Sequence, residues 1–237
     1  AATLDDPNIQ TPLATPLTTT LYTVDAMKLG TELVVNSNFS LGNTGFTSEY
    51  IYDNMGYGHY WVTANPLLYN GQWNIPVDHS PTTDNLMLLF DGDVTGDFPI
   101  IWQQSILVQP NTDYTFEFWG AMAYFAAPPS IEVKINGVVQ GTYTLQGGSQ
   151  WVGVWQPFTL IVNSGAAQQF TIEMRDLNAA ALGNDFALDD ISLRSICRYK
   201  GSIAVTVNNG NVHTLDLGPD ISACANAVHT FNAGAGF

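Results

Sequence analysis

Cationic side chains are scarce in this chain, which has 6 Lys and Arg against 21 Asp and Glu in 237 residues and a formal net charge of -15. Proteins bind nucleic acids and anionic membranes mainly through clustered Lys and Arg. The one basic cluster, Arg194, Arg198 and Lys200, is typical of a solvated hinge. We therefore expect no nucleic-acid partner.

Long apolar runs are missing as well. A membrane-spanning helix needs about 20 consecutive, mostly apolar residues, and the sequence contains no run of that kind. The sequence therefore predicts no membrane insertion.

Catalytic motifs are also missing. The sequence has no Gly-x-Ser-x-Gly elbow, no P-loop and no dinucleotide fingerprint. It lacks the Glu-x-Asp-x-x-Glu strand that is common in jelly-roll hydrolases, and glycosidases need two spaced carboxylates. The four His residues show no zinc-ligand spacing. We expect that the protein is not an enzyme.

Cysteine is limited to Cys197 and Cys224. The two residues either pair in an oxidising compartment or stay as separate thiols, because geometry does not follow from sequence. The start of the chain lacks a basic segment and resembles a mature terminus after signal cleavage. Together with the few Lys and the many Thr, Asn and Gly residues, this favours a secreted, extracellular or cell-surface protein.

Short apolar runs separated by Gly, Asn and Pro fill residues 32 to 197. Ile131, Val133 and Ile135 alternate and end at Asn136-Gly137, a strong signal for a two-residue hairpin turn. No segment shows a convincing helical period of apolar residues. This pattern predicts an all-β sandwich with little helix.

The segment from Gly183 to Leu193 is apolar like a buried strand, yet it carries three carboxylates. Buried charges are usually paired or bound to a metal. Strand alternation turns only one of Asp189 and Asp190 inward unless a bulge intervenes. The segment indicates either the closing strand of a calcium-tied sandwich or a solvated carboxylate pair at a sheet edge.

The two ends of the chain differ from this middle part. Residues 1–31 are expected to form an extended N-terminal arm, either a loose tail or an arm along the domain or a neighbouring subunit. Residues 198–237 follow a boundary near Arg198 to Ser202, and the pattern from Ile203 to Leu215 predicts a new hairpin. About 40 residues seldom hold a core alone, so we expect a partial domain and a fragment of a longer polypeptide.

Two motifs resemble a known family. The run from Glu32 to Ser40, with Gly42 and Phe46 after it, resembles the opening of carbohydrate-binding modules of the family 4/9 type, and Asp185 to Ile191 resembles their last strand. The resemblance implies a jelly-roll domain over residues 32–197 whose first strand, Leu33 to Phe39, meets the last strand near a structural Ca²⁺. It also implies Asp189 as the shared ligand, although Ser40 stands where an acidic ligand is frequent. Calcium prefers carboxylate, amide and carbonyl oxygens. The candidate ligands are Asp189, Asp190, Asn36, Asn38 and Asn43.

A second resemblance concerns the middle and the end of the chain. Motifs such as Asp78-His79-Ser80 and Trp102-Gln103-Gln104 are similar to lectin-like domains of Bacteroidetes surface and gliding-motility proteins. The run from Leu217 to Cys224 resembles the start of their immunoglobulin-like repeats. This resemblance implies a large cell-surface adhesin in which residues 198–237 begin a truncated immunoglobulin-like repeat.

Sugar recognition uses flat aromatic faces beside a few polar side chains. Aromatic residues in loops are better candidates than those in strands, although core packing is the alternative for each of them. The best stretch is rich in Gly and Asn. Its candidate ligand-binding residues are Tyr57, Tyr60, Trp61, Tyr69 and Trp73.

Acidic residues also gather between positions 78 and 97. Their types and loop positions allow either a loop calcium site or a hydrated acidic rim, because Asp often only caps turns. These residues are Asp78, His79, Asp84, Asp91, Asp93 and Asp97.

From these observations we expect a non-catalytic, calcium-stabilised jelly-roll module of a cell-surface adhesin that recognises glycans or another surface ligand. The alternative is a structural protomer or spacer of an extracellular filament or stalk. In that case neighbouring copies would join through the N-terminal arm and the C-terminal tail, and the loop aromatics would form a protein interface.

Overall fold

The computed structural model describes residues 4–9, 11–54, 56–75, 77–80 and 82–207. The chain divides into two compact units. One is Thr31–Ser195, and the other combines Ala1–Gly30 with Ile196–Phe237.

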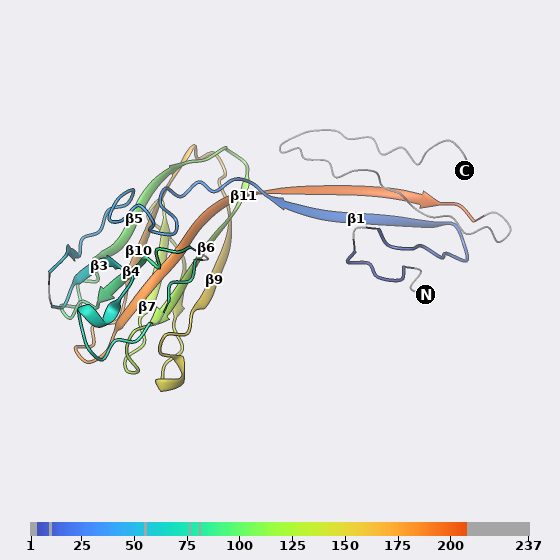
Figure 1. Cartoon of the computed structure of the whole chain (residues 1–237). Coiled ribbons are helices and arrows are strands. Elements are labelled where there is room, and N and C mark those ends of the chain that lie inside the picture. Colours follow the sequence, from blue (N-terminus) through green and yellow to red (C-terminus); the bar gives the residue numbers. More distant parts are fainter. Residues whose placement is uncertain (1–3, 10, 55, 76, 81, 208–237) are drawn as a thin grey trace. The chain divides into compact units, whose positions relative to one another are not determined.

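Strands make up nearly all regular structure of the described residues (Figure 1). They are β1 (Thr20–Leu29), β2 (Ile51–Tyr52), β3 (His59–Thr63), β4 (Met87–Asp91), β5 (Ile100–Leu107), β6 (Asp113–Met122), β7 (Ser130–Ile135), β8 (Val138–Thr144), β9 (Gln156–Asn163), β10 (Gln169–Asp176) and β11 (Asp185–Val205). Two short 3-10 turns, Pro66–Leu68 and Ser149–Trp151, are the described helical segments.

The Thr31–Ser195 unit is a sandwich of two sheets. The larger sheet has the order β2-β3-β4-β11-β6-β9, and the smaller one has the order β5-β10-β7-β8. Neighbouring strands are antiparallel except β2 and β3, which are parallel. The prediction of an all-β jelly-roll sandwich is therefore confirmed.

The main core lies between the two sheets. Alternate residues of β11, Phe186 and Leu188, are fully buried there, and Ile172 and Met174 of β10 join the same cluster. Burying one such side chain contributes about 1.5–3 kcal/mol. The alternating apolar residues that predicted the strands thus form the layer that holds the sheets together.

The hairpin predicted at Asn136-Gly137 is present between β7 and β8. Asn136 and Gly137 both have positive φ, 51° and 77°. Two-residue hairpin turns of this kind need positive φ at both central positions, and Asn-Gly adopts it most readily.

A second apolar cluster involves the loop between β3 and β4. Trp73 and Ile75 from this loop are buried together with Leu89 of β4, Ala121 of β6 and Ala187 of β11. Ala187 alternates with Phe186 and Leu188, which face the main core, so this cluster lies on the opposite, outer face of the larger sheet. The loop therefore packs on that face.

The expected first strand, Leu33 to Phe39, is a turn, which corrects the sequence interpretation. Asn36 and Phe39 have positive φ, 61° and 56°, outside the range of a regular strand. The Asn36 side chain donates to the carbonyls of Gly42 and Thr44 and so closes the turn. Two backbone hydrogen bonds join this turn to β11: the N–H of Leu33 donates to the carbonyl of Leu193 at 3.1 Å, and the N–H of Ile191 donates to the carbonyl of Ser37 at 2.9 Å.

In the other unit, β1 pairs with the second half of β11. The antiparallel register runs from Thr20 opposite Val205 to Leu29 opposite Ile196. Part of the expected N-terminal arm is therefore a strand, and β11 continues through the boundary expected near Arg198. The immunoglobulin-like start at Leu217 and the end of the expected hairpin lie outside the described residues.

No helix in the described part of the chain is long and apolar enough to span a membrane.

Candidate functional site

The closing strand β11 carries a β-bulge at its two adjacent aspartates. The pairing of β11 with β6 shifts register between Asp189 and Ser192. Asp190 has a φ of 47°, a left-handed conformation that is uncommon outside Gly, Asn and Asp. The bulge places both aspartates against the same loop, because Ser80 bonds to each of them. Strand alternation alone would turn only one of the two aspartates inward, and a bulge is the exception expected from the sequence.

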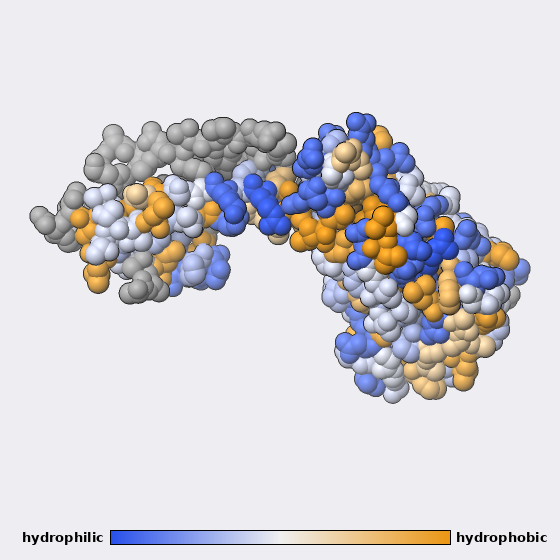
Figure 2. Space-filling view, turned by 180° about the vertical axis from the view of Figure 1, so that it is seen from behind, coloured by the Kyte–Doolittle hydropathy of each residue, from blue (hydrophilic) through white to orange (hydrophobic). Residues whose placement is uncertain are grey.

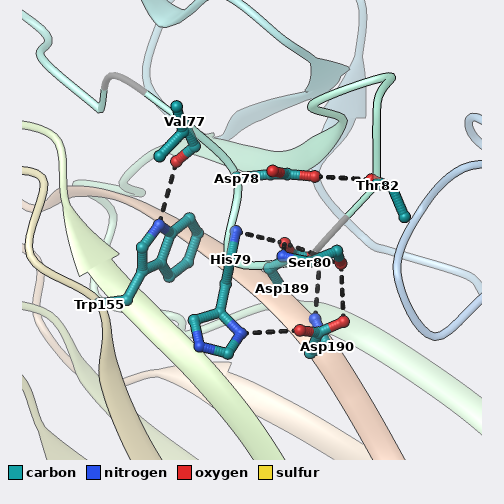
Figure 3. Close-up of polar contacts among 8 residues, drawn as sticks. All are labelled: Val77, Asp78, His79, Ser80, Thr82, Trp155, Asp189 and Asp190. Atoms are coloured by element: carbon teal, nitrogen blue, oxygen red, sulfur yellow. Dashed lines mark hydrogen bonds and ion pairs between the residues drawn. The ribbon is translucent and has the colours of Figure 1, made fainter.

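Asp189 is fully buried, and its carboxyl group is bound by backbone amides (Figure 3). Its Oδ2 accepts the N–H of His79 at 2.8 Å and that of Ser80 at 3.1 Å. Its Oδ1 accepts the N–H of Asp190 at 2.8 Å. Burial and, to a smaller extent, the charge of Asp190 raise the pKa of Asp189 to about 7, although hydrogen bonds from these amides act in the opposite direction.

Asp190 lies closer to the surface and holds two side chains of the loop. Its Oδ2 is 2.7 Å from Nδ1 of His79, and its Oδ1 accepts the Ser80 hydroxyl at 2.7 Å. The side chains of His79 and Asp190 are 27% and 29% exposed. Ser80 donates to carboxylates and not to His79, so the three residues do not form the relay of a serine hydrolase.

Aromatic rings surround the imidazole of His79. The ring stacks on Trp119 of β6 with centroids 3.7 Å apart and an interplanar angle of 16°. Trp155 meets it edge-on at 6.0 Å, and the Trp155 indole N–H donates to the carbonyl of Val77 at 3.0 Å (Figure 3). The loop is thus fixed to β6 and β11 by stacking and by hydrogen bonds.

The same loop is closed by Thr82. Its hydroxyl lies 3.0 Å from Oδ2 of Asp78 and 2.8 Å from Oδ1 of Asp84. Burial raises the pKa of Asp78, while hydrogen bonds from Ser40 and Thr82 lower the pKa of Asp84. Ser40, where an acidic calcium ligand was expected from the family, is thus a hydrogen-bond partner of this loop.

The predicted calcium ligands form hydrogen bonds with different parts of the structure. Asp189 and Asp190 bind the loop at residues 79 and 80, whereas the three asparagines bond within the first turn or to β3. Oδ1 of Asn36 accepts the N–H of Leu41, Oδ1 of Asn38 accepts that of Ser40, and Oδ1 of Asn43 accepts the Tyr60 hydroxyl. Within the described residues no group of three or more His, Cys, Asp or Glu is placed to hold a metal ion. The ligand set stays a prediction.

The predicted sugar-binding aromatics are divided by burial. Tyr60, Trp61 and Trp73 are buried, at 6%, 2% and 2% exposure, so their ring faces are taken by core neighbours. This corrects the expectation that they offer open platforms. The reason is that Tyr60 and Trp61 lie on β3, and the loop folds Trp73 back onto the sheet.

Tyr57 and Tyr69 are the accessible members of that predicted set. Tyr57 is half-exposed, and its hydroxyl donates to the carbonyl of Ala181 at 2.9 Å. Tyr69 packs one face against Trp61 with ring centroids 4.4 Å apart. Sugar binding by this set stays a prediction.

Glu32 links the first turn to β11, a role that was not predicted from the sequence. Its carboxylate accepts the N–H groups of Leu33, Val34 and Leu193, and it also binds Arg194 Nε at 3.1 Å. It therefore joins the first turn to the closing strand through hydrogen bonds and an ion pair. The available signal was its position as the only acidic residue at the start of the first family motif.

Only one cysteine of the predicted disulfide, Cys197, lies among the described residues. Cys197 is buried on β11 and disulfide-bonded. Cys224 lies outside the described residues, so its pairing with Cys197 stays a prediction.

No protein-family model and no curated protein sequence matches the chain. Among solved structures, the chain is similar to the xylan-binding CBM22-1 domain of Paenibacillus barcinonensis, with 13% identity, a TM-score of 0.42 and coverage of 73% of this chain and 97% of that one. A family 16 carbohydrate-binding module gives 15% identity, a TM-score of 0.42 and coverage of 68% and 98%.

An arabinose-bound α-L-arabinofuranosidase gives 16% identity and a TM-score of 0.46 over 70% of this chain, which spans only 27% of that enzyme. The chain is also similar to a bacteriophage tailspike protein, of which it spans only 21%. With TM-scores below 0.5, these likenesses carry no argument about function.

Proposed function

We propose that the Thr31–Ser195 unit is a non-catalytic extracellular module that binds glycans. The observation that carries the proposal is the aromatic and polar group around His79, where Trp119, Trp155 and Asp190 are each partly exposed. Binding sites for small polar ligands combine apolar or aromatic surface with a few fixed polar groups.

His79 supplies a polar group with a defined orientation. Because Nδ1 bonds to Asp190, a neutral His79 that donates from Nδ1 presents Nε2 as an acceptor. Stacking on Trp119 holds the ring in place. A sugar hydroxyl could therefore bond to Nε2 or Asp190 while an apolar face of the sugar contacts Trp155.

The contacts of the carboxylates support a non-catalytic role. Glycosidases need one carboxyl group to protonate the leaving oxygen and a second to act as base or nucleophile. Asp189 is buried and bound by amides, and Asp190 is engaged by His79 and Ser80. Neither is presented as a free nucleophile.

A structural Ca²⁺ remains part of the proposal, with Asp189, Asp190 and the three asparagines as the ligands that the sequence suggests. The test is to measure the melting temperature of the full chain in calcium and in chelator. A ligand that binds only the folded state raises this temperature. Identical melting temperatures in calcium and in chelator would therefore contradict a structural Ca²⁺.

Glycan binding is tested with the full chain on a glycan array and by affinity electrophoresis. Trp155→Ala is expected to weaken binding on the order of tenfold, because stacking of an aromatic ring contributes about 0.5–1.5 kcal/mol. Tyr52→Ala is the matched control, since Tyr52 is an exposed aromatic at the opposite edge of the same sheet. Tyr57→Ala tests the surface predicted from sequence. The absence of any glycan ligand, or equal losses in Trp155→Ala and Tyr52→Ala, would contradict the proposal.

The alternative role, a protomer of an extracellular filament or stalk, is favoured by the unit that contains β1. Leu21 and Met27 on β1 are 64% and 60% exposed, and Figure 2 shows apolar residues at the surface of this part of the chain. Sedimentation velocity and electron microscopy test this role. Regular polymers that dissociate in Leu21→Ser with Met27→Ser would support assembly, and monomers at all concentrations would exclude it.

A further inference from the structure

Asp176, the last residue of β10, is a buried carboxylate with one unsatisfied oxygen. The residue is 2% exposed. Its Oδ1 accepts the N–H of Ser130 at 2.9 Å and that of Asn178 at 3.1 Å. Its Oδ2 has no hydrogen-bond partner among the described residues. A buried polar atom without a partner is unfavourable and calls for a specific explanation.

Asn184 presents a second unsatisfied oxygen at the same corner of the sandwich. It is 0% exposed and precedes β11 with a φ of 64°. Its Nδ2 donates to the carbonyl of Asn178 at 2.8 Å, the residue whose N–H binds Asp176. Its Oδ1 has no partner among the described residues. Two buried oxygens, one anionic and one neutral, are thus linked through Asn178.

Asp93 adds a second carboxylate from the turn after β4. Gly92 lies so close to Asn184 that a Cβ at this position would overlap the Asn184 carbonyl oxygen and Nδ2. Asp93 follows directly, and its N–H donates to the Tyr50 hydroxyl at 2.9 Å. Its Oδ2 accepts from Thr95, whereas its Oδ1 has no hydrogen bond among the described contacts.

The charges of this corner are uncompensated. Burial and, to a smaller extent, the charge of Asp93 raise the pKa of Asp176 to about 6, although the N–H groups of Ser130 and Asn178 and the side chain of Asn184 act in the opposite direction. Arg175, the neighbouring cation, donates to the carbonyl of Phe98 and pairs with Glu173. Within the described residues, neither Asp93 nor Asp176 forms an ion pair.

We infer that Asp176, Asn184 and Asp93 form a binding site for a divalent cation of the calcium class. The donors are all oxygens, from two carboxylates and an amide, which is the set that hard cations prefer. A cation would neutralise both carboxylates and give Oδ2 of Asp176 and Oδ1 of Asn184 the partner they lack. The site differs from the ligand set suggested by sequence around Asp189.

The test is calorimetric titration of the full chain with CaCl₂ after chelator treatment, together with melting curves in EDTA and in CaCl₂. Wild-type protein is expected to bind Ca²⁺ and to melt at a higher temperature in CaCl₂. Asp176→Asn and Asp93→Asn are each expected to weaken binding on the order of tenfold or more, since ligand charge sets calcium affinity. Asp93 lies in a partly exposed turn, so this variant keeps the test informative if Asp176→Asn does not fold.

The matched control is Asp97→Asn, at an exposed aspartate near Asp93, and it is expected to keep wild-type calcium affinity. Asp189→Asn distinguishes this site from the one that the sequence suggests around Asp189. The inference is overturned if wild-type protein shows neither heat nor a melting shift, or if Asp189→Asn loses calcium binding while Asp176→Asn and Asp93→Asn retain it. Glycan binding enters none of these measurements, so the glycan proposal and this inference can fail separately.

Discussion

Asp189 and Asp176 are both almost completely buried in the sandwich unit, at 0% and 2% exposure, but their surroundings differ. Asp189 has donors for both oxygens, from His79, Ser80 and Asp190. Asp176 has two donors on Oδ1 and none on Oδ2. The loop between β3 and β4 supplies the amides at the first corner, and no described segment supplies them for Oδ2 at the second.

A buried acid is therefore a weak indicator of a metal until the hydrogen bonds to its oxygens are counted. Backbone N–H groups can stabilise a buried carboxylate as a cation does. Both carboxylate oxygens of Asp189 have donors from the protein, whereas Oδ2 of Asp176 has none among the described residues. The family motif suggests a calcium ligand at Asp189, whereas the unsatisfied buried oxygens lie at Asp176 and Asn184.

The largest effect is expected from Asp189→Ala. This change leaves the N–H groups of His79 and Ser80 without an acceptor, and each buried unpaired donor costs about 1–3 kcal/mol. We expect the free energy of unfolding to fall by about 3 kcal/mol at pH 5, measured by urea denaturation. Asp97→Ala, at an exposed aspartate, is expected to stay within about 0.5 kcal/mol of wild type. Equal losses in the two variants would show that the Asp189 corner is not specially stabilised.

Gly92→Ala tests the packing of the other corner. A Cβ at Gly92 would overlap the carbonyl oxygen and Nδ2 of Asn184, and overpacking costs about 1–3 kcal/mol. We expect a loss of about 2 kcal/mol in urea denaturation, together with weaker calcium binding. Gly71→Ala is the matched control, because its Cβ would meet nothing within 4 Å and its φ is not in the left-handed range. A neutral Gly92→Ala would mean that Asn184 is not held as described.

Asp185 is a third buried acid of the sandwich unit, and a second carboxylate, Asp91, lies opposite it. Asp91 in turn lies opposite His59, and burial with the Asp91 charge raises the pKa of Asp185 from 3.8 to about 7. The folded state therefore binds the proton more tightly than the unfolded state does. This stabilisation is full below pH 3.8 and is lost as the pH rises through about 7.

The measurement is urea denaturation in chelator from pH 5 to pH 8. One such proton changes stability by at most about 1.4 kcal/mol per pH unit. We expect the stability of Asp185→Asn to fall less steeply than that of wild type over this range. Parallel curves for the two proteins would contradict the raised pKa.

Much of the fold could be predicted from the sequence because it depends on local patterns. Alternation predicted β7, and Asn136-Gly137 predicted the hairpin turn. The turn at Leu33–Phe39 was mistaken for a strand because its apolar residues fit both states. Positive φ at Asn36 is an outcome of side-chain bonds to Gly42 and Thr44 that sequence does not reveal.

The candidate site could be predicted only in part. The two aspartates of the closing strand were visible as acids in an apolar run. Their partners, His79 and Ser80, lie about 110 positions away in sequence, and only folding brings them together. Burial of Trp61 and Trp73 could not be foreseen either, because Gly and Asn around them are equally compatible with an exposed loop.

The smallest effect is expected from Thr82→Val, which keeps the shape of the side chain and removes its hydroxyl. The hydroxyl lies within hydrogen-bonding distance of Asp78 and Asp84 but has one hydrogen to donate, so one net bond of about 1 kcal/mol is at stake. We expect a loss of that size in urea denaturation, and a further rise in the pKa of Asp78, because Thr82 lowers it at present. Thr142→Val, at an exposed threonine of β8, is the control and should be nearly neutral. If Thr82→Val matched the loss in Asp189→Ala, the loop would depend on Thr82 and not on the carboxyl group of Asp189, and the contrast between the two corners would have to be redrawn.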